Sequence, residues 1–301
     1  MLRREFLALA AAQILLPHGR GERSLGWLPN QLDPDWKTSQ LNGFGEGKVS
    51  CLWKPWKQAT GKDWIATKQK HTDCVAVTAG TCLDLLTAVQ VVTGYGVFKK
   101  HSATDPIYSG GRNNIVHDHT SAGMRGEWAI EYLKKYGNLL RQRYGIYDFT
   151  EYSEATCIKW DSAPLPEELL TLASDHPLLD SSSLSSWEEI RDAVSAGHPV
   201  MFCSTMGLEN DTRDKQGFVK PSGTWYHAMT IAGTKDDDRP GGCFLNSYGE
   251  AWASGPKVHD QPNGSVWVDA EYIDKYAKMY EVHAFSTYKG FPVPERDYIL
   301  W

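Results

Sequence analysis

The stretch Thr72-Asp73-Cys74-Val75-Ala76-Val77-Thr78-Ala79-Gly80 places one cysteine at the entrance of an almost wholly apolar run that continues to about Val92. Apolar residues recur in this run at intervals of three and four, which is the period of a helix. Asp84 alone brings charge to the opposite side, so we expect a helix that is buried nearly all round. Either Asp73 or Thr72 is suited to cap it. Cys74 then lies in the first turn, where the free backbone N–H groups and the helix dipole favour a thiolate.

Cys74 by itself is also explained as a small buried core residue. Two later stretches favour a catalytic role instead. His227 lies within a strand-like run at 225–233, and Asn246 lies at the end of a second such run at 242–247. A cysteine at a helix start, followed downstream by a histidine and then an asparagine, is the order needed for a thiol nucleophile, its base and the group that orients the base.

At these positions the sequence resembles the papain-like cysteine peptidases, as a divergent bacterial or phage-type member. In that family a Cys-Trp-Ala-Phe-Ser-type segment opens the central helix, a His-Ala-Val strand carries the histidine, and an Asn-Ser-Trp-Gly turn carries the asparagine. The matching segments here are Cys74-Val75-Ala76-Val77-Thr78, His227-Ala228-Met229 and Asn246-Ser247-Tyr248-Gly249. The resemblance covers about residues 60–285, with the motifs in the family's order.

The chain is predicted to be helical in its first part and rich in strands later, which is an α+β pattern. Short strands are expected at 199–205, 225–233, 242–247 and 265–268. The resemblance implies the papain-like two-lobe fold, with a helical N-terminal lobe built on the central cysteine helix and an antiparallel, β-barrel-like C-terminal lobe. We therefore expect a catalytic domain over 61–301, divided into a helical lobe at about 61–150 and a β-rich lobe at about 151–301.

The first 20 residues have the features of an export signal. Arg3 and Arg4 precede a short apolar stretch with small residues, which resembles a twin-arginine signal. The stretch is too short to span a bilayer as the anchor of a folded protein. We expect a periplasmic or otherwise extracytoplasmic protein, and the alternative is an amphipathic N-terminus of a cytoplasmic one. Residues 21–60 are predicted to form an irregular arm that packs along the domain through its tryptophans.

The composition of the chain limits the classes of molecule that it is expected to bind. With 301 residues and 41% hydrophobic content, the chain is long enough for one large domain or two packed lobes. Its net charge is −6 and it has no basic stripe, which argues against nucleic-acid binding. The six cysteines form no Cys-x-x-Cys pair. We expect a peptide or protein substrate, no metal or organic cofactor and no stable membrane insertion, and the oligomeric state is left open.

The resemblance also implies roles for individual residues. Cys74 would attack a carbonyl carbon as the thiolate, and His227 would hold the ion pair and then protonate the leaving amine. Asn246 would orient the imidazole. A family glutamine that stabilises the oxyanion corresponds to Gln69, one residue closer to the cysteine than is usual, and the alternative for Gln69 is a surface glutamine. Asp73 stands where a small residue is common, and its charge would raise the thiol pKa.

Several alternatives stay open at this point. The function indicated is a thiol-dependent peptidase with a Cys-His-Asn triad, and the alternative is a catalytically weak or inactive papain-like binding or structural protein. Another thiol enzyme of the Cys–His class is a further candidate. Two segments fit the family's groove-lining glycines, Gly110-Gly111 by residue type and Gly123 by its distance from the following helix. The sequence does not choose between these two segments.

Overall fold

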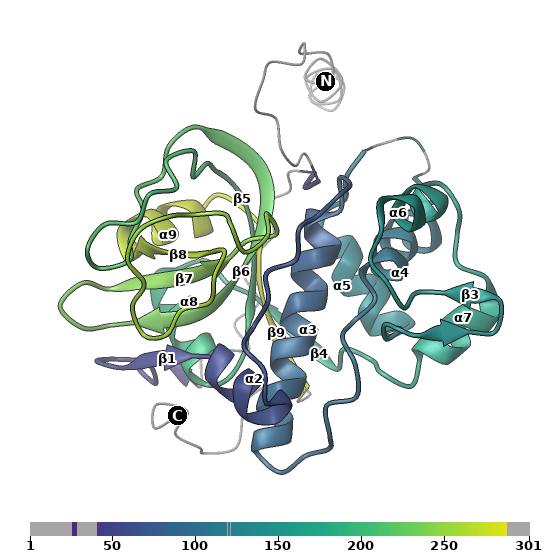
Figure 1. Cartoon of the computed structure of the whole chain (residues 1–301), viewed down its shortest axis with the longest axis horizontal. Coiled ribbons are helices and arrows are strands. Elements are labelled where there is room, and N and C mark those ends of the chain that lie inside the picture. The colour runs from purple at the N-terminus through teal and green to yellow at the C-terminus, as the bar shows by residue number, and fades with distance from the viewer. Residues whose placement is uncertain (1–25, 29–40, 119, 121, 288–301) are drawn as a thin grey trace, which may run out of the picture.

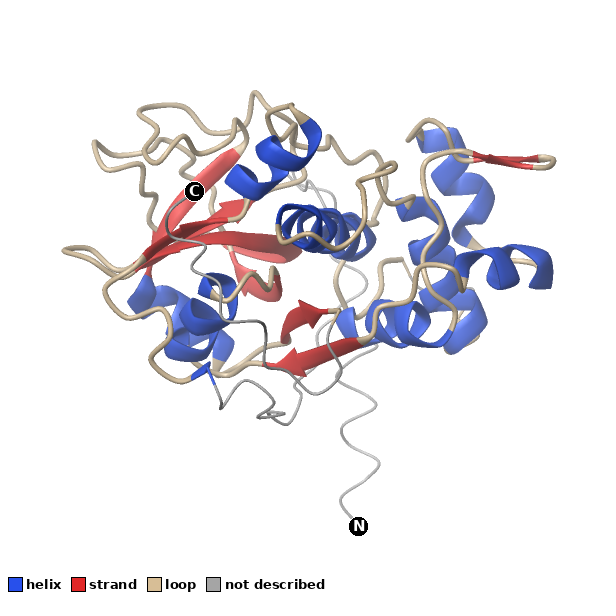
Figure 2. Cartoon of the chain, turned by 90° about the horizontal axis from the view of Figure 1, so that it is seen from below, coloured by secondary structure: helices blue, strands red, loops and turns tan. Residues whose placement is uncertain are grey.

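The computed structural model describes residues 26–28, 41–118, 120 and 122–287 (Figure 1). The predicted signal segment at 1–20 lies outside these residues, as does most of the first half of the arm. The described chain forms two halves that differ in kind (Figures 1 and 2). One half is mainly helical, the other is built on a large antiparallel sheet, and one long helix lies between them.

The helical half is assembled from short elements around a single apolar core. Its members are α4 (Thr104–Ser109), the π-helix η2 (Gly110–Ile115), α5 (Gly126–Lys135), the hairpin of β2 (Arg143–Tyr144) and β3 (Tyr147–Asp148), α6 (Glu154–Asp161) and α7 (Glu167–Ala173). Side chains of α6 and α7, and Leu178 after them, are buried in the same core as those of α4 and α5. The helical half thus extends further along the chain than the expected boundary near residue 150, because α6 packs on α4.

The other half is a seven-stranded antiparallel sheet. Its strands are β1 (Val49–Cys51), β4 (Asp180–Ser183), β5 (Val200–Met206), β6 (Thr224–Lys235), β7 (Gly241–Leu245), β8 (Ser265–Asp269) and β9 (Val282–Ser286). They are ordered β4-β9-β5-β6-β7-β8, with β1 paired to the far part of β6. The predicted α+β class and the four predicted strands are confirmed, each strand to within about two residues at either end.

The long helix α3 (Cys74–Val92) joins the two halves. Leu85 and Val89 on its later turns pack into the core of the sheet, whereas Val75 and Ala79 on its early turns belong to the core of the helical half. This double burial explains why its sequence is apolar on nearly all sides. The helix is long and apolar enough to cross a membrane by composition alone, but it is the core helix of this fold.

The arm is more regular than predicted. Within 21–60 the described residues include β1 and the helix α2 (Trp53–Thr60), which ends at Gly61 in a left-handed conformation. Trp53 and Trp56 are both buried, three residues apart on one face of α2. Trp56 meets Trp64 edge to face at a centroid distance of 4.8 Å. These contacts with later residues order the segment. Helices α8 (Trp187–Ser195) and α9 (Ala270–Ala277) also pack on the sheet.

Candidate active site

Cys74 is the first residue of α3 and is fully buried. The backbone N–H of Ala228 on β6 acts on this sulfur and lowers the pKa of the thiol. Burial raises the pKa of the thiol to about 12, and the charge of Asp73 acts in the same direction. The Ala228 N–H opposes both effects but does not outweigh them. In this conformation Cys74 is therefore a neutral thiol.

His227 and Asn246 are brought together by the pairing of β6 with β7. The Nε2 atom of His227 lies 2.8 Å from the Oδ1 atom of Asn246, which also accepts from the Ser247 N–H at 2.7 Å. Since Oδ1 can only accept, Nε2 carries the imidazole proton and Nδ1 presents its lone pair. Nδ1 is buried and has no hydrogen-bond partner among the described residues. Burial lowers the pKa of His227 to about 4, so the ring is neutral.

Aromatic rings surround this histidine. Tyr248 stacks on the His227 ring, with centroids 5.1 Å apart and planes at 18°. Trp225 contacts the same ring edge to face at 6.0 Å, and Trp252 packs on Tyr248. The stacked tyrosine keeps water from one face of the imidazole and fixes its plane. The sequence alone gave Tyr248 no role beyond its place in the Asn-Ser-Tyr-Gly turn.

Gln69 lies against the same turn that carries Asn246. Its backbone N–H donates to the Ser247 carbonyl oxygen at 2.8 Å, and its Oε1 accepts from the Ser247 hydroxyl. Its side-chain amide donates to the carbonyl oxygen of His71 at 2.9 Å. Gln69 is thus held near the site, but its donor group is engaged within its own loop. This amide nitrogen carries two N–H groups, so the second is the donor that Gln69 could offer to an oxyanion while the first stays on His71.

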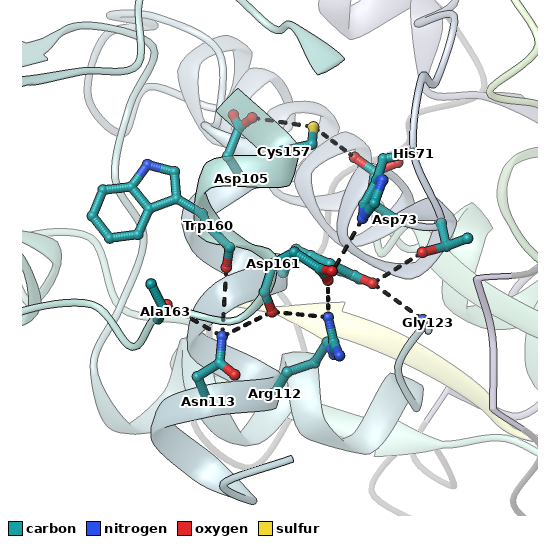
Figure 3. A network of polar contacts seen from close by, with 12 residues as sticks. His71, Asp73, Asp105, Arg112, Asn113, Gly123, Cys157, Trp160, Asp161 and Ala163 are labelled. Atoms are coloured by element: carbon teal, nitrogen blue, oxygen red, sulfur yellow. Dashed lines mark hydrogen bonds and ion pairs between the residues drawn. The ribbon is translucent and has the colours of Figure 1, made fainter. Parts of the chain in front are cut away.

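Asp73 takes the N-cap position of α3, but its carboxylate makes no cap hydrogen bond. It accepts instead from the Tyr152 hydroxyl, at 2.9 Å to one oxygen and 3.1 Å to the other. The thiol of Cys157 lies between Asp73 and the buried Asp105, with its sulfur 3.7 and 3.4 Å from their oxygens (Figure 3). Burial raises the pKa of Asp73 to about 7. The neighbour of Cys74 is thus largely neutral below that pH.

A three-residue segment of the arm, Gly26–Leu28, lies directly over Cys74 and is called the strap here. The strap pairs in parallel with Met124: the Met124 N–H donates to the Gly26 carbonyl oxygen at 2.7 Å, and the Leu28 N–H donates to the Met124 carbonyl oxygen at 2.9 Å. A Cβ atom added to Gly26 would lie 2.5 Å from the sulfur of Cys74. The strap therefore closes the approach to the thiol. No local signal in the sequence identifies it.

The position of the strap distinguishes between the two candidate segments for the groove-lining glycines. A Cβ atom on Gly110 would meet the ring of Tyr132 at 2.2 Å, and one on Gly111 would meet the Met124 side chain at 2.4 Å, because both glycines are buried against α5. Gly123 has a φ angle of +88°, and a Cβ atom there would meet the Gly26 carbonyl oxygen at 2.7 Å. Gly123 is the residue that lets another backbone approach. Of the two candidate segments, the one with Gly123 therefore lies against the strap.

All six cysteines are described, and all are buried and free. The structure thus brings His227 and Asn246 together, places Cys74 beside the residue after His227, and holds Gln69 on the Asn246 turn. It does not form a hydrogen bond between Cys74 and His227. The catalytic roles of the four residues remain predictions.

The central cysteine helix packed against an antiparallel sheet defines the fold of the papain-like cysteine proteases. The chain is similar to the crystal structure of xylellain, a cysteine protease from Xylella fastidiosa, with a TM-score of 0.62 and 14% identity over 91% of this chain and 100% of that one. It is also similar to digestive procathepsin L 3 of the Tenebrio molitor larval midgut, with a TM-score of 0.50 and 12% identity over 86% of this chain and 83% of that one. At these identities the likeness concerns the fold. No protein-family model and no curated protein matches the sequence.

Proposed function

We propose that this chain is a thiol-dependent peptidase of the papain-like family that hydrolyses peptide bonds through Cys74, His227 and Asn246. The observation that carries the proposal is the state of the imidazole. Its Nε2–H is fixed by Asn246 at 2.8 Å, and its Nδ1 lone pair is buried and unused. The backbone N–H of the next strand residue, Ala228, acts on the Cys74 thiol and lowers its pKa. A base in this state is ready to accept the proton of a thiol.

The mechanism begins with departure of the strap from Cys74. A substrate then takes its place along Gly123 and Met124, and water enters the region. Burial is the largest cause of the raised pKa of Cys74 and of the lowered pKa of His227. Opening the site to water therefore brings the two pKa values toward each other. The proton moves from sulfur to Nδ1, and the thiolate attacks the substrate carbonyl carbon.

The tetrahedral intermediate carries a negative oxygen that needs donors. The backbone N–H of Cys74, at the start of α3, and the side-chain amide of Gln69 are the groups proposed to supply them. His227 then gives its Nδ1 proton to the departing amine, leaving an acyl-enzyme on sulfur. Water activated by the same nitrogen hydrolyses the thioester and restores the thiol.

The test is covalent labelling of the full-length protein with a peptidyl epoxide across pH 4 to 9, together with hydrolysis of a mixed fluorogenic peptide library. We expect labelling at Cys74, loss of hydrolysis in Cys74→Ala, and a decrease on the order of 10²-fold or more in His227→Ala. His198→Gln is the matched control, because His198 is also a fully buried histidine of the sheet half but lies away from the site. Its effect on hydrolysis at pH 7.5 should be small.

One result would support the alternative, a papain-like binding or structural protein. The covered, neutral thiol and the missing Cys74–His227 hydrogen bond are the features that favour it. If labelling spreads over the six cysteines with Cys74 no faster than the others, and His227→Ala changes nothing, the peptidase proposal is wrong.

A further inference from the structure

One tyrosine hydroxyl connects the loop before Cys74 to the segment that pairs with the strap. Tyr108, near the end of α4, is buried in the core of the helical half. Its hydroxyl oxygen accepts from the Gly123 N–H at 3.1 Å and lies 3.1 Å from the Thr72 hydroxyl oxygen, with which it shares a hydrogen bond. Thr72 is two residues before Cys74, and Gly123 directly precedes Met124. A single side chain thus joins the two segments.

Gly123 and Met124 use their backbone groups differently. The Gly123 N–H is bonded to Tyr108, whereas the Met124 N–H and carbonyl oxygen are both bonded to the strap. A peptide that paired one residue earlier would need the Gly123 N–H, which the tyrosine already occupies. A shift of one residue in such a pairing changes every contact that follows. The Tyr108 hydroxyl therefore selects Met124 as the residue that pairs.

The ring of Tyr108 is held by two residues that share one carboxylate. The Arg112 guanidinium lies over the ring at 4.9 Å, and the His71 ring meets it edge to face at 5.6 Å. Both reach Asp161, the last residue of α6 (Figure 3). Arg112 donates to its carboxylate and, at 3.0 Å, to its carbonyl oxygen, and the Nε2 atom of His71 lies 3.5 Å from its Oδ1. The tyrosine hydroxyl is therefore held in place from several sides.

We propose that Tyr108 is a positioning residue, which sets the register of a peptide paired with Met124 relative to the Cys74 sulfur. For a substrate peptide this inference rests on the proposed peptidase function. Met124 offers one N–H donor and one carbonyl acceptor, the two groups that now bind the strap. The same hydroxyl that holds Gly123 is bonded to Thr72, so the pairing residue keeps a fixed place relative to the start of α3.

Amide hydrogen exchange on the full-length protein, resolved to single residues, tests the positioning without any substrate. Tyr108→Phe removes the hydroxyl and keeps the ring. The Gly123 N–H then loses its partner, so the segment that it fixes should loosen. We expect the Met124 and Leu28 amides, which join this segment to the strap, to exchange on the order of tenfold faster than in the wild type.

Tyr132→Phe is the matched control. Tyr132 is a fully buried tyrosine of the same core, and its hydroxyl has no hydrogen-bond partner among the described residues. Its loss should leave exchange at Met124 unchanged. The strap has a second attachment, because the Trp27 indole donates to the buried carboxylate of Glu281 at 3.1 Å. The tyrosine substitution at position 108 should therefore loosen the pairing without releasing the strap.

Two substrate comparisons test the register. A fluorogenic peptide long enough to pair with Met124 is compared with an aminoacyl amide too short to reach it, and both need the same uncovered thiol. We expect Tyr108→Phe to lower the ratio of their kcat/KM values, long over short, by about tenfold. N-methylation of the long peptide, scanned one residue at a time, should cost the wild type about tenfold at one residue, the one that donates to Met124, and cost Tyr108→Phe less than about threefold there.

Should Tyr108→Phe fail to fold, Thr72→Val removes the other end of the connection and should change both readouts in the same direction, by about threefold or more. Unchanged Met124 exchange in Tyr108→Phe, an equal change in Tyr132→Phe, or a full N-methylation cost in Tyr108→Phe overturns the inference. If no peptide is cleaved while Tyr108→Phe alone accelerates Met124 exchange, the positioning of this segment stands and the peptidase proposal is wrong.

Discussion

A single methyl group added to Gly26 should uncover the Cys74 thiol. In Gly26→Ala the new Cβ atom would lie 2.5 Å from the Cys74 sulfur and 2.9 Å from both the Cys74 nitrogen and the Thr72 carbonyl oxygen. Two of these three atoms are backbone and cannot rotate away. The strap must therefore move, and the covered conformation loses stability relative to the uncovered one.

Overpacking of this kind costs about 1–3 kcal/mol. At about 1.4 kcal/mol per factor of ten, the uncovered population should rise roughly 5- to 140-fold. Alkylation by iodoacetamide reports that population when uncovering is faster than the reaction. The rate at Cys74, located by mass spectrometry, should increase by the same factor at pH 8. The buried Cys82 and Cys203 in the same molecule serve as internal references.

Gly242→Ala is the matched control. A Cβ atom at Gly242 would meet the side chain of Ile273 at 2.8 Å in the core of the sheet, away from the strap. This change should loosen its surroundings without accelerating Cys74 selectively. If Gly26→Ala leaves the Cys74 rate unchanged, or speeds all cysteines alike, the strap is not what limits access to the thiol.

Three further predictions concern the groups around the site. Asp73→Asn should speed labelling of Cys74 by up to about tenfold above pH 7, where the wild-type carboxyl is ionised and raises the thiol pKa. The same substitution should have little effect on the labelling rate at pH 5. A pH–rate profile tests this, and an equal acceleration at both pH values would contradict it. The free energy of unfolding should fall as the pH drops from 6.5 toward 4, because burial lowers the pKa of His198 and His227 to about 4 and the unfolded chain binds their protons at a higher pH than the folded chain does. Each histidine contributes at most roughly 3 kcal/mol to this loss. Urea titrations at each pH should therefore show a smaller loss of stability in acid for His198→Gln than for the wild type, and an equal loss in both proteins would refute this. Asn246→Ala should lower kcat on the order of 10²-fold with KM nearly unchanged, since the His227 ring loses the group that orients it while no contact with bound substrate is removed. A change confined to KM would assign Asn246 to substrate binding instead.

Much of the fold could be predicted from local patterns. The period and uniform apolarity of the run that starts at Cys74 predicted a helix buried on nearly all sides, and α3 lies between two cores. The four later strands were predicted from short apolar runs bounded by turn residues. The boundary between the halves could not be placed, because helices α6 and α7 have no sequence feature that says which core they join.

The candidate site could also be predicted only in part. The order of cysteine, histidine and asparagine along the chain was enough to select Cys74, His227 and Asn246, and β6 and β7 do bring the last two within 2.8 Å. The surroundings of these residues could not be predicted from the neighbouring sequence. The sequence showed that a carboxylate precedes the nucleophile, but not that Asp73 turns from its cap position to a tyrosine 79 positions away.

What the sequence by itself determined is the set of elements and the chemistry of the residues they carry, since both follow from patterns that span a few residues. The tertiary structure alone decided that the strap covers Cys74 and that Trp27 meets Glu281. These two residues are 254 positions apart, and neither has a local feature that indicates the other. Their contact depends on how the arm, the start of α5 and the start of β9 pack together, and such long-range packing is set by the whole chain.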